Sequence, residues 1–375
     1  MKIPIPYCLL IISFAFMPGF AYGDDTFSAS AKPIKILIVP GHDEEYSGAI
    51  YKDIREADLT LAISKKLAAS LAKDPGLSVT VSRTDLGYIP ELAQYFANST
   101  EGIKTFMTEH LQETIQSVLS GEIQIGEQVP HNAAPELVAY RLYGISKWAS
   151  EQHFDLILHV HFNDSWPRNI DAIGEYNGYT IYVPADGLLN AASGQALGEA
   201  IGNRFHETFY PSNLPLEESG ADKAGAVRDF NLIALGARKT LSIPSILLEY
   251  SYIYEPILSP EFFSLTTDVM VNATKSGIYA HLGKKETNKN LKYVWSQKLI
   301  RGPGKKVDVL ALQYALRELN YYPPALSTRD DCPITGIFGP CTEKAVKAFQ
   351  KDKGLITYGI VGPQTRAILN KIFHQ

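Results

Sequence analysis

A strand, a helix and a second strand follow one another near the start of the chain, and this order constrains the fold more than any other feature. Residues 34–39 form an apolar run, and a helix is predicted from Glu56 because an apolar residue recurs every four positions from Leu59 to Leu71. Apolar and polar side chains alternate over residues 77–81, as in a half-buried strand. Strands joined through a helix lie parallel in one sheet, so we predict an α/β domain.

Strands and helices continue to alternate as far as residue 249. The sequence predicts helices over 135–152 and 193–209, and strands over 156–161, 178–183 and 244–248.

Three reactive side chains stand where predicted strands end. His42 follows the first strand, His161 ends the strand over 156–161, and Glu249 follows the last one. Open α/β sheets place their sites at these strand ends. With Glu56, the two histidines form a ligand set typical of catalytic zinc, and Glu249 could transfer a proton. Each residue also has a structural interpretation, as a loop histidine, a core histidine or a helix-terminal acid. From the residues alone, both interpretations stay open.

Size and charge exclude several classes of protein. The chain has 375 residues, of which 45% are hydrophobic, so it can form a large and a small globular domain. A net charge of −5 argues against a nucleic-acid binder, and no apolar run after residue 23 is long enough to span a membrane. Residues 284–305 carry seven Lys or Arg against one Glu, a net charge of +6. We interpret them as a solvated basic linker, either a plain spacer or a contact to an anionic surface.

The first 23 residues have the features of a secretory signal peptide. Lys2 precedes an apolar run, and small residues stand just before Asp24. Cleavage there would remove Cys8 and leave Cys332 and Cys341, nine positions apart. In an exported chain such a pair predicts a disulfide, with two buried free thiols as the alternative.

Four segments around the reactive residues resemble, in order, the motifs of the zinc-dependent N-acetylmuramoyl-L-alanine amidases of bacterial cell-wall turnover, the amidase_3 type. They are Val39–His42, Arg55–Leu61, His161–Asn163 and Pro244–Glu249, and Ser82–Asp85 and Arg141 match further family positions. The resemblance covers residues 34–283 and implies a twisted, mostly parallel sheet flanked by helices. It also implies that His42, Glu56 and His161 bind Zn²⁺ and that Glu249 is the catalytic acid/base.

Two departures from the family pattern lie beside the expected metal site. Asp43-Glu44-Glu45 replaces glycines after the first histidine, and Glu44 or Glu45 is an alternative ligand to Glu56, although the helix context favours Glu56. His159 stands where the family has serine and faces the same side of its strand as His161. His159 could be a partner of the ligands, an extra ligand or a residue that only packs. We interpret it as a residue that does not bind the metal.

Residues 88–134 form an insertion with a helical pattern of its own. Some relatives carry a helix that blocks the zinc site at a position further along the chain. We expect no such blocking helix here, and we interpret His131, in a Pro-His-Asn turn of the insertion, as a loop residue.

The C-terminal 70 residues contain an internal repeat. The sequence GIFGPCT at 336–342 recurs as GIVGPQT at 359–365, and each copy precedes a helical pattern. With a third helix from Val309, these motifs resemble the type 1 peptidoglycan-binding domain over residues 307–373. The resemblance implies a small all-α, three-helix domain, residues 306–375, that binds peptidoglycan; a bundle that serves only for packing is the alternative.

The sequence as a whole predicts an exported, periplasmic or secreted hydrolase associated with the cell wall. Its expected partner is peptidoglycan, with no nucleic acid and no stable membrane insertion after signal cleavage. The resemblance selects the amide bond between N-acetylmuramic acid and L-alanine. Two alternatives remain: a non-catalytic peptidoglycan-binding protein, motivated by the acidic loop, and a zinc peptidase that cuts within the stem peptides.

Overall fold

The structure is a computed structural model that describes residues 32–165, 167–285 and 291–374. The predicted signal peptide, residues 1–23, lies outside the described residues. Within the described ranges, no helix is both long enough and apolar enough to cross a membrane.

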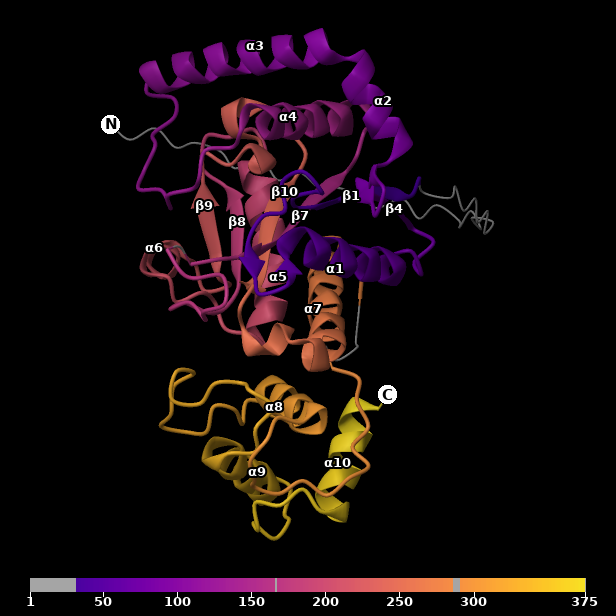
Figure 1. Cartoon of the computed structure of the whole chain (residues 1–375), viewed down its shortest axis with the longest axis vertical. Helices are drawn as coiled ribbons and strands as arrows, with labels where there is room; N and C mark the ends of the chain where they lie inside the picture. Colours follow the sequence, from indigo (N-terminus) through magenta and orange to yellow (C-terminus); the bar gives the residue numbers. More distant parts are fainter. Residues whose placement is uncertain (1–31, 166, 286–290, 375) are drawn as a thin grey trace, which may run out of the picture. The chain divides into compact units, whose positions relative to one another are not determined.

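Six strands form one sheet. They are β1 (Ile34–Pro40), β4 (Leu77–Val81), β7 (Leu156–Asn163), β8 (Thr180–Pro184), β9 (Ala226–Asp229) and β10 (Ser245–Tyr252). Their order in the sheet is β4-β1-β7-β10-β8-β9. β4, β1, β7 and β10 run parallel to one another. β8 runs antiparallel to β10, and β9 runs parallel to β8. The mostly parallel sheet expected from the sequence is confirmed (Figure 1).

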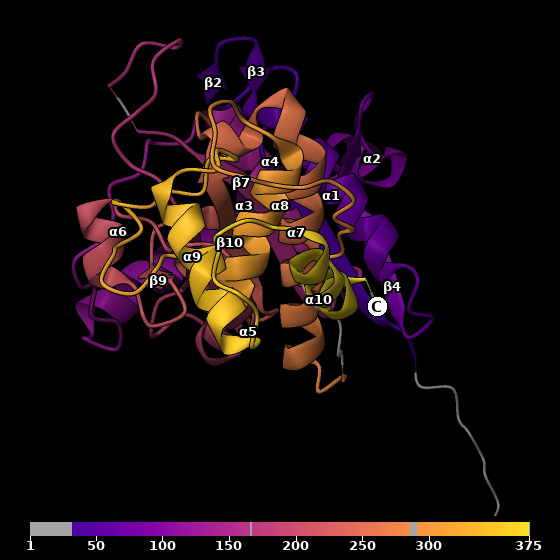
Figure 2. The same ribbon diagram turned by 90° about the horizontal axis from the view of Figure 1, so that it is seen from below.

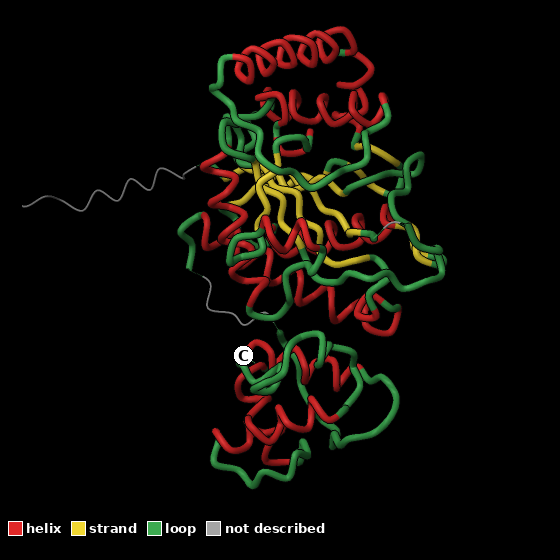
Figure 3. The backbone as a smooth tube through the Cα atoms, turned by 90° about the vertical axis from the view of Figure 1, so that its left-hand side faces the viewer, coloured by secondary structure: helices red, strands yellow, loops and turns green. Residues whose placement is uncertain are grey.

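Helices cover both faces of this sheet. One layer contains α1 (Glu56–Leu71), α5 (Ala191–His206) and α7 (Pro260–His281), and the other contains α2 (Pro90–Asn98), α3 (Thr100–Leu119) and α4 (Glu136–Glu151). Alternate residues of β1 pack against the two layers. Ile36 belongs to the hydrophobic core on the side of α1, α5 and α7, whereas Leu37 belongs to a core with Trp148 of α4. Figure 3 shows the strands between the helices.

Shorter elements complete the α/β part. They are β2 (Ile50–Tyr51), β3 (Ile54–Arg55), β5 (Arg83–Thr84), β6 (Gly87–Tyr88), α6 (Pro215–Gly220) and three 3₁₀ turns, Ile233–Leu235, Ala237–Lys239 and Pro256–Leu258. The last strand of the sheet differs from expectation, because β10 continues beyond Glu249 to Tyr252, with a shift of register against β7 between these two residues.

Three helices form the C-terminal part, as predicted: α8 (Val307–Glu318), α9 (Pro340–Asp352) and α10 (Pro363–Phe373) (Figure 2). The repeat has a structural counterpart. The carboxamide of Gln313 accepts the backbone N–H of Gly336 and donates to Thr342, and Gln350 does the same with Gly359 and Thr365. Both glycines have φ of 74°, in the left-handed region that favours glycine. The structure also contains the disulfide Cys332–Cys341.

The described part of the basic stretch is not simply solvated. Leu291, Trp295 and Leu299 are buried, and Asn370 of α10 exchanges two hydrogen bonds with the backbone of Trp295. The Trp295 indole N–H donates to the backbone oxygen of Asp308 in α8. Three apolar residues of this stretch therefore pack into the helical C-terminal part, whereas Lys292 and Lys298 between them are exposed.

Candidate metal centre and catalytic cavity

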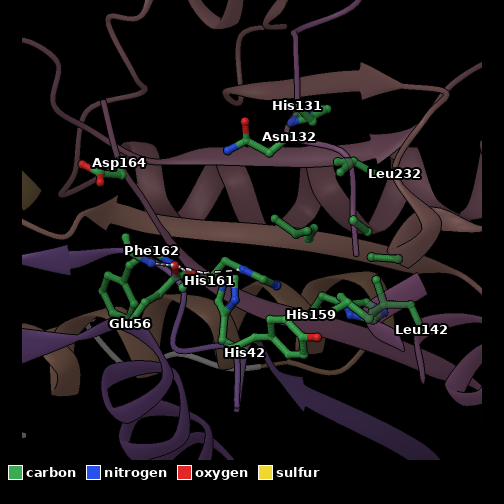
Figure 4. A pocket seen from close by; sticks show the side chains of 18 of the residues that line it. His42, Glu56, His131, Asn132, Leu142, His159, His161, Phe162, Asp164 and Leu232 are labelled. Carbon is green, nitrogen blue, oxygen red and sulfur yellow. Dashed lines mark hydrogen bonds and ion pairs between the residues drawn. The ribbon is translucent and has the colours of Figure 1, made fainter. Parts of the chain in front are cut away.

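Three predicted residues converge above the ends of the parallel strands. His42 follows β1, Glu56 is the first residue of α1, and His161 lies near the end of β7. One possible ligand atom from each lies within 4.8 Å of the others. The Glu56 carboxylate stands between the two imidazoles (Figure 4), with Oε2 3.1 Å from His42 Nε2 and Oε1 3.0 Å from His161 Nδ1.

Backbone groups fix the Glu56 carboxylate. Its Oε1 accepts the N–H of Phe162 at 3.1 Å, and its Oε2 accepts the N–H of Ala49 at 2.9 Å. The Glu56 side chain is only 5% exposed, and each of its two oxygens accepts a backbone N–H group. Glu56, the first residue of α1, therefore places a fixed and desolvated carboxylate in the cluster.

Local backbone geometry explains the glycines around the cluster. A Cβ atom on Gly41 would lie 2.3 Å from the His161 ring, and one on Gly48, whose φ is +71°, would lie 2.4 Å from Glu56 Oε2. His42 itself has a φ of 62°, a conformation that costs energy in a residue with a Cβ and is typical of functional sites.

Burial and charge determine the protonation of the three groups. Burial raises the pKa of the Glu56 carboxyl, but His42 and His161 outweigh it and hold that pKa below its usual range. Burial, together with the charges of His42 and Arg83, lowers the pKa of His161 although the hydrogen bond and charge of Glu56 raise it. For His42, burial also lowers the pKa, but the charge and hydrogen bond of Glu56 bring it above the usual value. An ionised Glu56 and a neutral His161 are the forms that bind metal ions.

Glu249 faces the same cavity but is not one of the three converging residues. In the sheet it pairs with His161 on one side and Thr180 on the other. Its Oε2 atom is buried, and no described group hydrogen-bonds to it. Burial, followed by the negative charges of Glu56 and Glu217, raises the pKa of the Glu249 carboxyl well above its usual value. Such a group keeps its proton at pH values at which an exposed glutamate is ionised.

The acidic loop after His42 is paired with arginines. Asp43 Oδ2 and Glu45 Oε2 lie 2.9 and 2.8 Å from the Arg141 guanidinium on α4. Glu44 pairs with Arg55 at 3.0 Å. None of the three acids belongs to the converging cluster. The alternative ligands Glu44 and Glu45 are thus engaged elsewhere.

Residues 120–135, which we call the strap, border the cavity through residues 128–135. Val129 is buried in a core with Tyr182 and Leu247, and His131 Nε2 lies 2.8 Å from Oδ2 of Asp229. The Asp229 side chain is completely buried. His131 is in a loop, as predicted, but it also anchors the strap to the end of β9. None of the residues that line the cavity belongs to α2 or α3, the two helices of the insertion.

A cavity of about 1330 Å³ lies between the strap, α4 and the ends of the strands. This exceeds the roughly 300–1,000 Å³ of typical small-molecule pockets. His159 also lines it; burial, and then the charge of His161, lower the pKa of His159 to about 3. His159 is not among the converging ligand atoms, consistent with a role other than metal binding.

Several supporting residues were not singled out from the sequence. Arg83, inside a motif that was recognised, is buried and donates to the backbone oxygens of Gly41 and Ala57 on both sides of the cluster. Glu217 of α6 is buried and accepts hydrogen bonds from Asn163 and Tyr182. Its neighbour Glu218 is exposed, and nothing in the local sequence distinguishes the two acids.

Two protein-family models match the chain. The model described as N-acetylmuramoyl-L-alanine amidase matches residues 36–279, and the one described as a peptidoglycan binding domain matches residues 305–369. No curated protein matches.

Among solved structures, the chain is similar to the catalytic domain of CwlV, an N-acetylmuramoyl-L-alanine amidase from Bacillus (Paenibacillus) polymyxa var. colistinus, with 16% identity and a TM-score of 0.41 over 67% of this chain and 99% of that one. It is also similar to N-acetylmuramoyl-L-alanine amidase from Clostridium difficile 630, with 18% identity and a TM-score of 0.43 over 68% and 100% of the two chains. A third similar structure is the N-acetylmuramyl-L-alanine amidase Ami1 from Mycobacterium smegmatis. Its sequence identity is 14% and its TM-score is 0.41, over 67% of this chain and 98% of that one.

Proposed function

Because the chain belongs to the N-acetylmuramoyl-L-alanine amidase family, we propose that it hydrolyses the amide bond between N-acetylmuramic acid and L-alanine with the help of a zinc ion. The chain is a peptidoglycan amidase with a peptidoglycan-binding domain. The proposal adds the metal, its ligands and the acid/base. The observation that carries it is the convergence of His42, Glu56 and His161.

The donor set fits zinc. Two imidazole nitrogens and one carboxylate oxygen are the protein ligands found at catalytic zinc sites, which leave a further position open. The backbone donors of Phe162 and Ala49 hold Glu56 in place, as groups behind metal ligands commonly do. When bound, zinc acts as a Lewis acid that polarises a carbonyl and makes water more acidic.

Glu249 is the proposed acid/base. Its carboxyl lines the cavity, lacks a fixed partner on Oε2 and is partly desolvated. It can take a proton from the attacking water and deliver a proton to the leaving amine of L-alanine. The neighbouring charges of Glu56 and Glu217 favour the protonated form, which suits delivery to the leaving group.

We further propose an exported protein with four parts: a signal peptide over residues 1–23, a catalytic domain over 34–283 with the insertion 88–134, a connecting stretch over 284–305 and a wall-binding domain over 306–375. A peptidoglycan substrate and a peptidoglycan-binding domain support a location at the cell wall. The Cys332–Cys341 disulfide supports an oxidising compartment.

Metal analysis tests the ligand set. We expect about one zinc per wild-type chain, most of it lost in His161→Ala and retained in His110→Ala, a histidine of α3 outside the cavity lining. Equal zinc in wild type and His161→Ala would reject these ligands.

Mass spectrometry of digested peptidoglycan tests the bond. New amino termini at L-alanine and free lactyl carboxyls on the glycan are expected. Cuts within the stem peptides would identify a peptidase, and an unchanged digest with zinc-loaded protein would identify a non-catalytic wall binder.

A further inference from the structure

His159 faces the catalytic cavity without a role in the metal cluster. The residue is only 2% exposed, and it lines the cavity. In the sheet its register partners are Val39 of β1 and Leu247 of β10, both buried and apolar. Figure 4 shows His159 on the Leu142 side of His161, away from Glu56. An imidazole therefore stands in an otherwise apolar row of the cavity floor.

One ring nitrogen of His159 is unpaired among the residues that the structure describes. Its Nδ1 atom is buried and has no hydrogen-bond partner among the described residues. Leaving a polar atom buried and unpaired destabilises a fold, so native structures rarely do so without a function. A leucine would fill the same row without this cost. Packing alone therefore does not account for a histidine here.

The ring is suited to an uncharged polar group. The ring offers an N–H donor, and no described carboxylate pairs with its buried Nδ1 atom. Leu142 and Leu232 line the same cavity and offer apolar surface. The group that fits has one polar end and one small apolar end, as an acetamido group does.

We propose that His159 is a specificity-determining residue that binds the acetamido group of the N-acetylmuramic acid whose lactyl amide is cut. This inference rests on the proposed function. Side chains two residues apart on one strand lie about 6.6 Å apart on the same face. In muramic acid the acetamido group and the lactyl ether occupy adjacent ring carbons. A sugar with its lactyl carbonyl at His161 therefore brings its acetamido group within reach of His159.

Paired substrates test the proposal. For each protein, kcat/KM is measured on a muropeptide and on the same muropeptide with the muramic amine deacetylated, and the ratio of the two values is compared. We expect His159→Leu to lower this ratio at least about tenfold, with zinc content and thermal stability no lower than in wild type. His159→Gln, which restores a donor and an acceptor, should recover part of the ratio. His206→Leu on α5, outside the cavity lining, should leave it unchanged.

An unchanged ratio in His159→Leu would overturn the proposal, and so would loss of zinc, which would make His159 a metal ligand. A measurement on the wild-type protein keeps the test independent of variant folding. N-acetylmuramic acid should shift the ring ¹⁵N resonances of His159 saturably, whereas muramic acid should not, and equal responses would refute the assignment. If wild type fails to release L-alanine amino termini from the acetylated substrate, the proposed function fails instead, and the binding measurement remains interpretable.

Discussion

Replacing Glu249 by glutamine should make the protein less active and, without metal, more stable. The substitution keeps the shape of the side chain but removes its titratable proton. If Glu249 is the acid/base, hydrolysis should fall by about 10²–10⁴-fold, the usual contribution of a positioned proton donor or acceptor. Zinc content should not change, because Glu249 is outside the converging cluster.

The stability change follows from the raised pKa of the Glu249 carboxyl. An unfolded glutamate titrates near 4.5, whereas burial and two neighbouring carboxylates favour the protonated form in the folded protein. Protonation of the folded state therefore supports stability fully below pH 4.5, and this support is lost as the pH rises towards the folded pKa. Each pH unit in that interval lowers wild-type stability by about 1.4 kcal/mol. Wild-type protein therefore loses stability as the pH rises from 4.5 towards the folded pKa, and glutamine does not incur this loss.

Thermal unfolding with a chelator present, at pH 5 and at pH 7, measures this difference. We expect the melting temperature of Glu249→Gln to exceed that of wild type at pH 7, and the gap to shrink at pH 5. A gap independent of pH would refute the raised pKa. Near-wild-type turnover would refute the catalytic role, and loss of zinc together with activity would place Glu249 among the metal ligands.

Three further predictions concern the strap and the C-terminal part. His131→Ala removes a partner of the buried Asp229 and should lower the free energy of unfolding by about 1–3 kcal/mol, measured by urea denaturation; a change within error would show that the anchor does not hold the strap. Trp295→Ala removes a fully buried indole and should cost about 3–5 kcal/mol in the C-terminal part, visible as an earlier unfolding transition. The third prediction concerns pull-downs on insoluble peptidoglycan at moderate salt. A fragment that starts at residue 291 should bind, whereas one that starts at residue 306 should bind less because it lacks Trp295. Equal binding would show that Trp295 does not support the wall-binding domain.

The sequence was sufficient to predict that the three proposed ligands converge, because each is tied to a local element. His42 follows a clear apolar strand, Glu56 begins a strongly periodic helix, and His161 ends another buried strand. Parallel strands bring such ends to one edge of a sheet, so positions far apart in sequence become neighbours. The structure brings all three within 4.8 Å of one another.

Residues that act through long-range pairing were beyond the reach of the sequence. Asp229 is buried because β9 joins the edge of the sheet beside β8, and this short strand has no distinctive pattern. His131 reaches Asp229 across 98 positions. Likewise, Trp295 sits among lysines, and only its contacts with α8 and α10 reveal that the stretch is part of the folded C-terminal region.

The acidic loop shows how a departure from a family pattern can leave the chemistry intact. Asp43 and Glu45 add negative charge beside the metal cluster, which motivated the hypothesis of a non-catalytic protein. Both carboxylates lie against the Arg141 guanidinium, and the Asp43 side chain is only 13% exposed. Arg141 offsets part of this negative charge, although the charge of Asp43 still helps to raise the pKa of His42. Asp43 also accepts the backbone N–H of Tyr46, which closes the loop. The substitution therefore stiffens the segment that holds His42 in its left-handed conformation, a role that glycines cannot perform.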